Sequence, residues 1–559
     1  MKMSTRMLSC AAALLSAAAP VFAQKSDDAR FAELARDAAR QFEAARADAQ
    51  TRPTVPITTP GTNVELTLDD ATARALERNL DLAVERLNPM IQDTNLERIH
   101  AAYRPTLTSQ VGHLARVQPP TSQLNGGLSV QNDTSTYNSG INQALKWTGG
   151  DFVFSFNNNK QVSSGTFSNF NPAFNNSFAA TLTQPLLRDF FIDGTRQQLK
   201  VTVINREISD IQLKGTLATT VANVRNAYWE LVFSGQAVDV AKGSLDLADK
   251  LVLDNKARVE VGTMAPLDVV QSEAEAATRR QALAQAEATL HTAELSLKRL
   301  IVNGTDDPLW RATITPVDRP EFRSEPLDVE TAVRKALSSR TDLDQARKTL
   351  ESNDVTMKFL KNQTLPALDA IANYGAAGLG GTQFVRSGLG STQVLNTIPG
   401  GYGDAWRTLT GRDYPTWNFQ VNFSYPLGGS AADAVYARSR VQRNQTAAQL
   451  KALELTVATE VTNAALQVES NLKTYEAATV ARSLAETRLS AEQSRFEVGL
   501  STNFFVVQAQ RDLATAQNSE LRALLNYRKA VVDYGRSQEA PATRGGSAVT
   551  TVTGGAGGN

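Results

Sequence analysis

The side chains that could carry out chemistry are few and scattered along this chain. Its three histidines, His100, His113 and His291, lie far apart, and none has a second ligand at the spacing that a zinc site needs. The only cysteine is Cys10, and the sequence has no Gly-x-Ser-x-Gly motif of the serine hydrolases. We therefore predict that the protein is not an enzyme and that it has no metal site and no cofactor.

Two glycine-rich segments, Gly378 to Gly381 and Gly388 to Gly390, resemble phosphate-binding loops at first sight. No Lys-Ser or Lys-Thr pair follows either segment at P-loop spacing, and neither lies in a Rossmann pattern. We predict instead that both belong to one long glycine-rich loop, residues 375–414, at the end of a β-structure.

The N-terminus predicts export. Lys2 and Arg6 precede a short apolar stretch, and Ala23 ends a typical cleavage site for a secretory signal peptide. Removal of this segment would also remove Cys10, so we expect no disulfide. The formal net charge of zero gives no electrostatic reason to expect nucleic acid as a partner.

The chain contains an internal duplication. The motif Arg-x-Glu-Val-Gly that ends at Gly262 returns with its end at Gly499, an offset of 237 (499 − 262). Upstream, an offset of 261 (336 − 75) relates Ala75 to Ala336 in the pair Ala-Leu. Registers that persist over this length indicate two homologous halves. The predicted segments are a signal peptide (1–23), a helix and linker (24–65), the first repeat (66–302), a connector (303–326), the second repeat (327–536) and a disordered tail (537–559).

Each half contains one very long helical pattern without proline. The first runs from Gly194 to Val261 and the second from Ser430 to Val498, so each would extend for about 100 Å at the usual rise per residue. After Gly262 and Gly499 the pattern resumes in shorter helices. We therefore predict two helical hairpins, each with a glycine at its tip.

Short strands with alternating side chains are predicted in both halves. Phe152, Phe154 and Phe156 alternate with polar residues and would share one face. Such aromatic residues suit a lipid interface, although packing in an ordinary core would also explain them. The predicted strands are 106–117, 141–147, 152–156, 178–184, 367–374 and 417–423.

This order of elements resembles the outer membrane efflux protein family, the TolC-like channels, over residues 66–536. The resemblance rests on Pro185 and Pro426 at strand-to-helix junctions and on the turns at Gly262 and Gly499. It implies a mainly helical fold with a membrane β-barrel. In such a homotrimer, four strands per protomer build one twelve-stranded barrel in the outer membrane, and twelve helices continue it across the periplasm. The first half offers an extra hairpin, formed by the predicted strands 141–147 and 152–156, and we nevertheless predict four strands per protomer.

The resemblance also implies a function and partners. Such channels are passive exit ducts that sit in outer-membrane lipid and dock on a periplasmic adaptor and an inner-membrane pump, which is proton-driven or an ABC transporter. Efflux of small molecules is the predicted role, and type I protein secretion is a variant that the sequence leaves open. The alternative is a periplasmic coiled-coil scaffold or structural surface protein, which the helices would suit but the strands would not.

The tips of the two hairpins are the predicted adaptor-docking sites, because the resemblance places the docking contacts at these turns. The residues assigned to docking are Arg258, Gly262, Thr263, Arg495, Gly499, Leu500 and Ser501.

The periplasmic entrance is predicted close to these tips. Asp268 follows Gly262 by six residues, and in a threefold assembly it would supply three carboxylates that bind cations. A solvated helix N-terminus, which favours an acidic residue, explains Asp268 equally well. In the second half Phe505 and Gln508 stand where the family often has acidic residues, so an apolar constriction by Phe505 is the alternative there.

Overall fold

The computed structural model describes residues 63–119, 129–165, 168–318, 327–388, 391 and 393–541. The predicted signal peptide, nearly all of the segment 24–65, and most of the predicted tail lie outside the described residues. The chain divides into two compact units. Unit 1 combines Met1–Leu82, Thr220–Glu325 and Val468–Val532, and unit 2 combines Ala83–Thr219, Pro326–Gln467 and Asp533–Asn559.

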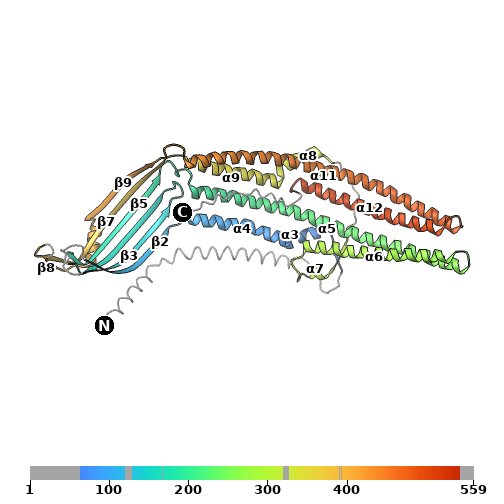
Figure 1. Cartoon of the computed structure of the whole chain (residues 1–559), viewed down its shortest axis with the longest axis horizontal. Coiled ribbons are helices and arrows are strands. Elements are labelled where there is room, and N and C mark those ends of the chain that lie inside the picture. The colour runs from blue at the N-terminus through green and yellow to red at the C-terminus, as the bar shows by residue number, and fades with distance from the viewer. Residues whose placement is uncertain are drawn as a thin grey trace, which may run out of the picture. The chain divides into compact units, whose positions relative to one another are not determined.

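Four long helices form the two predicted hairpins (Figure 1). Helices α5 (Gly194–Glu260) and α11 (Ala431–Glu497) have 67 residues each. After the tips the chain continues as α6 (Pro266–Ile301) and α12 (Asn503–Ser537). Both long helices begin and end at positions that differ by 237.

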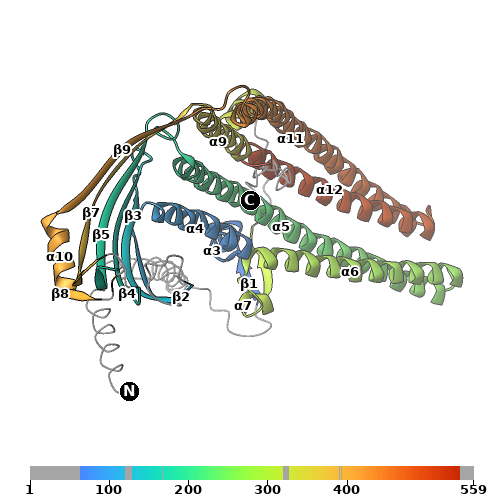
Figure 2. The ribbon, with the colours of Figure 1, turned by 60° about the vertical axis from the view of Figure 1, so that its left-hand side comes forward.

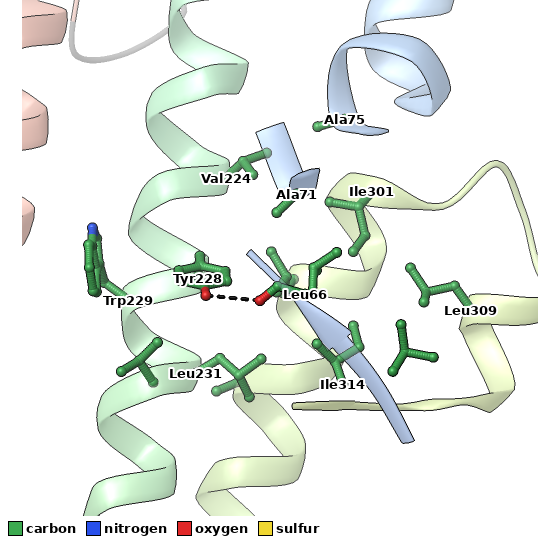
Figure 3. Packing of buried hydrophobic residues seen from close by; sticks show 14 of the residues in the cluster. Leu66, Ala71, Ala75, Val224, Tyr228, Trp229, Leu231, Ile301, Leu309 and Ile314 are labelled. Atoms are coloured by element: carbon green, nitrogen blue, oxygen red, sulfur yellow. Dashed lines mark hydrogen bonds between the residues drawn. The ribbon is translucent and has the colours of Figure 1, made fainter. Parts of the chain in front are cut away.

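The core of unit 1 gathers around Tyr228 of α5 (Figure 3). The Tyr228 hydroxyl lies within hydrogen-bond distance of two acceptors, the Leu66 carbonyl oxygen at 3.0 Å and the Asp318 carboxylate at 2.8 Å, and its single proton is shared between them. Two short strands that the sequence did not predict, β1 (Asn63–Leu66) and β6 (Thr313–Pro316), pair in parallel beside it. Helices α3 (Leu68–Arg78) and α7 (Pro308–Arg311) complete this core.

In unit 2, three helices accompany the long ones: α4 (Leu80–Ala101), α8 (Val329–Ser339) and α9 (Thr341–Gln363). Arg340 lies between α8 and α9 with only 1% of its side chain exposed. Its guanidinium binds Asp342 at 3.0 Å and the Glu460 carboxylate of α11 at 2.5 Å, and it donates to the Ser537 carbonyl oxygen at 3.2 Å. This cluster joins three helical segments of unit 2.

Unit 2 also contains a curved antiparallel sheet (Figure 2). In the described residues the sheet has seven strands, in the order β2-β3-β4-β5-β7, with β8 and β9 both paired to β7. The strands are β2 (Thr106–Gln118), β3 (Val130–Ala144), β4 (Asp151–Ser163), β5 (Phe170–Pro185), β7 (Ala367–Arg386), β8 (Val394–Ile398) and β9 (Tyr414–Ser424).

The prediction of four strands per protomer is therefore wrong for this chain. Six of the seven strands are long, and the additional pair is the hairpin of β3 and β4. Residues 132–139 lie outside the predicted strands because Asn, Asp, Ser and Thr predominate among them. They nevertheless form a strand, because neighbours on both sides satisfy their backbone N–H and C=O groups.

The predicted loop over residues 375–414 is also wrong. Strand β7 continues through Gly378 and Gly380, and helix α10 (Tyr402–Gly411) packs across them (Figure 2). A Cβ on Gly378 would lie 2.1 Å from the Ala405 carbonyl oxygen, and one on Gly380 would lie 2.4 Å from the Ala405 nitrogen. The glycines are needed because the α10 backbone approaches the strand so closely.

None of the helices that the structure describes combines the length and the apolar character that a membrane span requires.

Candidate functional site

The sheet of unit 2 has one apolar and one polar face, because side chains alternate along each strand. The strand registers place one residue from each long strand in a row on the apolar face: Leu107, Ile141, Phe154, Ala180, Tyr374 and Trp417. The same face carries Phe152, Phe156, Phe178, Phe419, Val421 and Phe423, and the opposite face carries Thr108, Ser155, Asn157, Ser177, Asn373 and Gln420.

Much of the apolar face is uncovered in the single chain. Trp417 is 77% exposed and Phe423 is 67% exposed. Exposed apolar surface of this extent marks a binding surface for protein or lipid. Helix α10 covers part of this face, where Trp406 stacks on Phe156 at 5.3 Å between ring centroids.

Both hairpin tips in unit 1 have the same backbone geometry. Gly262 has φ +75° and Gly499 has φ +78°, the left-handed conformation that ends many helices. The Thr263 N–H donates to the Arg258 carbonyl oxygen at 2.9 Å, and the Leu500 N–H donates to the Arg495 carbonyl oxygen at 2.8 Å. Arg258 and Arg495 thus accept the bonds that close the two turns with their backbones.

Apolar side chains surround both tips without partners to bury them. Those that are at least half exposed are Val261, Leu267, Val270, Val498, Leu500, Phe504 and Phe505. Ser501 is held locally, since its hydroxyl donates to Glu492 at 2.7 Å. The tips therefore present exposed apolar side chains on turns that backbone hydrogen bonds close.

The residues predicted at the entrance lie at the start of the returning helices. Asp268 is in the first turn of α6, and its carbonyl oxygen accepts a hydrogen bond from the Asn503 side chain at 3.3 Å. Phe505 packs edge-on against Phe504 at 5.6 Å and remains 50% exposed. The Gln508 side chain donates to the Asp512 carboxylate at 2.8 Å.

The two predicted junction prolines end their strands differently. Pro185 is the last residue of β5 and pairs with Asp369. Pro426 lies two residues after the end of β9 and precedes α11. Proline has no backbone N–H, and at neither position is an N–H needed for a hydrogen bond to a further strand.

Contacts that the sequence did not predict join the two hairpins within unit 1. The Arg258 guanidinium lies over the Phe496 ring at 4.5 Å from its centroid. Farther along, the buried Asn255 side chain donates to Asn503 at 2.9 Å. No spacing rule identifies such pairs, because their partners lie in different halves of the chain.

A further contact between the hairpins involves a buried carboxylate. Glu275 of α6 has 2% of its side chain exposed and binds Arg511 of α12 at 2.5 Å and Arg279 at 2.7 Å. Burial opposes ionisation of Glu275, but the two arginines outweigh it and hold the pKa of the carboxyl below its usual value. The stabilisation is therefore complete above about pH 4.3 and is lost only as the pH falls through the lower folded-state pKa.

We expect Arg511→Ala to loosen α12 from α6, because Glu275 would stay buried with one partner fewer. Hydrogen exchange of the α12 amides around Gln510 should accelerate at least fivefold at pH 7. Arg488→Ala is the matched control, since the exposed Arg488–Asp512 pair lies within one hairpin. Equal exchange in both variants would show that the Glu275 contact does not hold the hairpins together.

His113 hydrogen-bonds Ser135 at 3.0 Å, and His291 lies 3.7 Å from Glu294. In the part of the chain that the structure describes, no group of three or more His, Cys, Asp or Glu side chains could hold a metal ion.

The chain has counterparts among known proteins. The family model described as outer membrane efflux protein matches residues 123–303 and 332–533. The chain therefore belongs to the outer membrane efflux protein family. No curated protein matches the chain in sequence.

Solved structures of channels have the same fold at low sequence identity. The CmeC outer membrane channel of Campylobacter jejuni is 13% identical, with a TM-score of 0.59 over 84% of this chain and 85% of that one. VceC of Vibrio cholerae is 13% identical, with a TM-score of 0.58 over 85% and 96%. The open state of the Neisseria gonorrhoeae MtrE channel is 16% identical, with a TM-score of 0.57 over 85% and 89%.

Proposed function

We propose that three copies of this chain form a passive exit duct of a tripartite efflux system. The sheet would lie in the outer membrane, and the long helices would continue the duct through the periplasm. The observation that supports this most directly is the sheet of unit 2, which is apolar on one face and polar on the other. Lipid on the apolar face and water on the polar face would satisfy both.

The hairpin tips are the proposed contact with a periplasmic adaptor, which would link the duct to an inner-membrane pump. Exposed apolar side chains such as Val261, Leu500 and Phe504 support this assignment. Energy would come from the pump, because the chain offers no nucleotide-binding motif of its own. Type I secretion would use the same docking surface.

A scaffold in the periplasm is the competing function, and gel mobility separates the two. We expect the protein in the outer-membrane fraction, as a trimer that resists SDS and changes mobility on heating. A soluble periplasmic protein whose mobility does not depend on heating would contradict the proposed duct.

We propose that Asp268 and Phe505 line the periplasmic entrance. Three Asp268 carboxylates held close together would attract cations, because like charges at short range cost free energy unless a cation intervenes. Phe505 is half exposed in the single chain, so its ring is available to pack against another copy. Closure would depend on Phe505 and cation preference on Asp268.

In planar bilayers, Asp268→Asn should therefore weaken cation selectivity and block by divalent cations. Phe505→Ala should raise the resting conductance severalfold. Asp249→Asn is the control, because Asp249 pairs with Arg280 on the exposed helix surface. If both variants conduct like the unaltered channel, the entrance lies elsewhere and Asp268 serves only the helix N-terminus.

A further inference from the structure

Among the residues that the structure describes, both outer strands of the sheet have an unpaired edge. There, strand β2 pairs only with β3, and β9 pairs only with β7. Every residue of β9 is exposed, and so are nearly all residues of β2. An uncovered edge leaves a row of backbone N–H and C=O groups ready to pair with another strand. Lipid cannot satisfy these groups.

We propose that β9 of one copy pairs with β2 of the next, so that three copies close an eighteen-stranded barrel. This inference rests on the threefold assembly proposed above and departs from the twelve strands that the family resemblance implies. Strand β8 adds no position, because it pairs with β7 at residues 383–386, beyond the end of β9. Each copy therefore contributes six positions, and three copies contribute eighteen.

The two edges are complementary in direction, length and face. Each of the five steps from β2 to β9 is antiparallel, so β2 and β9 run in opposite directions. The strands have 13 and 11 residues. Antiparallel pairing between copies would continue the alternation of strand directions around the whole barrel. It would also keep the apolar residues Leu107 and Phe423 on one face.

The strand registers also give a reasonable tilt for the closed barrel. The row across one copy starts at Leu107, one residue after the start of β2, and ends at Trp417, seven residues before the end of β9. If the strand ends are level where two copies meet, Thr106 lies opposite Ser424. The row of paired residues then meets the next copy six residues farther along β2 than Leu107. Three copies give a total register shift of eighteen residues around the barrel, which corresponds to a strand tilt of about 35°. Membrane barrels have tilts of about 35–45°.

The additional hairpin would widen the lumen. At this tilt, eighteen strands give a backbone diameter of about 34 Å, whereas twelve strands give about 23 Å. The lumen wall would carry mainly Asn, Ser, Thr and Gln, as Asn157, Ser177 and Gln420 illustrate. A wide, mostly uncharged wall would not select among small molecules, so selection would fall to the helix tips and the pump.

Disulfide trapping tests the contact between copies, because Cys10 is the only cysteine in the sequence. Thr108→Cys combined with Asn422→Cys should yield covalent dimers and trimers on oxidation, since both positions would be opposite each other on the polar face. Thr108→Cys combined with Thr416→Cys is the control, about 20 Å out of register. Links in the control alone, or in neither variant, would overturn the proposed pairing.

Deleting Val130 to Ser163 tests the strand number. The registers run from Leu107 through Ile141 and Phe154 to Ala180, so without β3 and β4 Leu107 would lie opposite Ala180 on the same face. Strand β2 would still be antiparallel to β5. Electron cryomicroscopy should show eighteen wall strands in the unaltered trimer and twelve, in a barrel about two-thirds as wide, in the variant.

The imaging also separates this inference from the proposed function. A conducting trimer with twelve wall strands in the unaltered protein would overturn the inference and leave the exit duct intact. A protein that forms no trimer would overturn both. If the deletion variant does not assemble, the strand count of the unaltered trimer and the disulfide pair still decide the matter.

Discussion

Replacing Arg340 with alanine is expected to destabilise the protein by about 3 kcal/mol, the lower end of the cost of removing one partner of a buried ion pair, because Asp342 and Glu460 keep 20% and 39% of their side chains exposed. Arg340 is 1% exposed and binds Asp342, Glu460 and the Ser537 carbonyl oxygen. Alanine would leave these acceptors without their shared donor and would open a cavity between the helical segments. Urea titration of the detergent-purified protein, followed by circular dichroism, measures the change.

Arg334→Ala is the matched control for Arg340. Arg334 lies in the same part of the chain and pairs with Glu330, but its side chain is 74% exposed. Exposed pairs contribute about 0 to 1 kcal/mol, so this variant should unfold close to the unaltered protein. Similar midpoints for the two variants would show that the Arg340 cluster is not a support of unit 2.

The second large effect is expected at the hairpin tips. Gly262→Val and Gly499→Val place a β-branched residue at φ +75° and φ +78°, where the strain is about 1 to 2 kcal/mol or more. The strain should distort the turns and impair adaptor docking. Cells that carry either variant should therefore lose most of their efflux-dependent drug resistance, measured as the inhibitory concentration, while the trimer persists in the membrane.

Two further variants show whether the backbone conformation is the cause. Gly499→Asn should keep most of the resistance, because asparagine tolerates the left-handed region. Gly243 lies in α5, the helix that precedes the first tip, with open space where a Cβ would be and no positive φ, so Gly243→Val should also keep most of the resistance. Full resistance in Gly262→Val and Gly499→Val, at normal amounts in the membrane, would refute docking at the tips.

The helical hairpins could be predicted from the sequence because their signals are local. The absence of proline between Pro185 and Pro266 and the glycine at each turn define them without reference to the rest of the chain. Because the chain is duplicated, the proline-free stretch and the turn glycine occur in both halves. The elements α5 and α11 begin and end at the same offset of 237 that the motifs show.

The sheet was harder to predict because its strands are polar on one face and depend on distant partners. Asn132, Thr134 and Asn138 of β3 look like loop residues until β2 and β4 are placed beside them. Gly378 and Gly380 suggest a loop because the helix that needs them lies about 25 residues away. Strand propensity is a weak guide at such residues, because neighbouring strands and helices determine whether they form a strand.

The candidate site was predictable to a similar degree. The turns at Gly262 and Gly499 follow from the repeated motif. The entrance role of Asp268 stays a prediction from the family resemblance, and the contact of Glu275 with Arg511 joins residues 236 positions apart. Pairing across that distance requires the packed hairpins, which no local pattern specifies.

Single-channel recording in planar bilayers tests the central claim most directly. The purified protein, without adaptor, pump or nucleotide, should insert as a unit and give discrete, cation-preferring conductance steps. Because transport through the duct is proposed to be passive, no energy source should be needed. A purified trimer that never permeabilises the bilayer, at any voltage and with or without the Phe505→Ala substitution, would contradict the account.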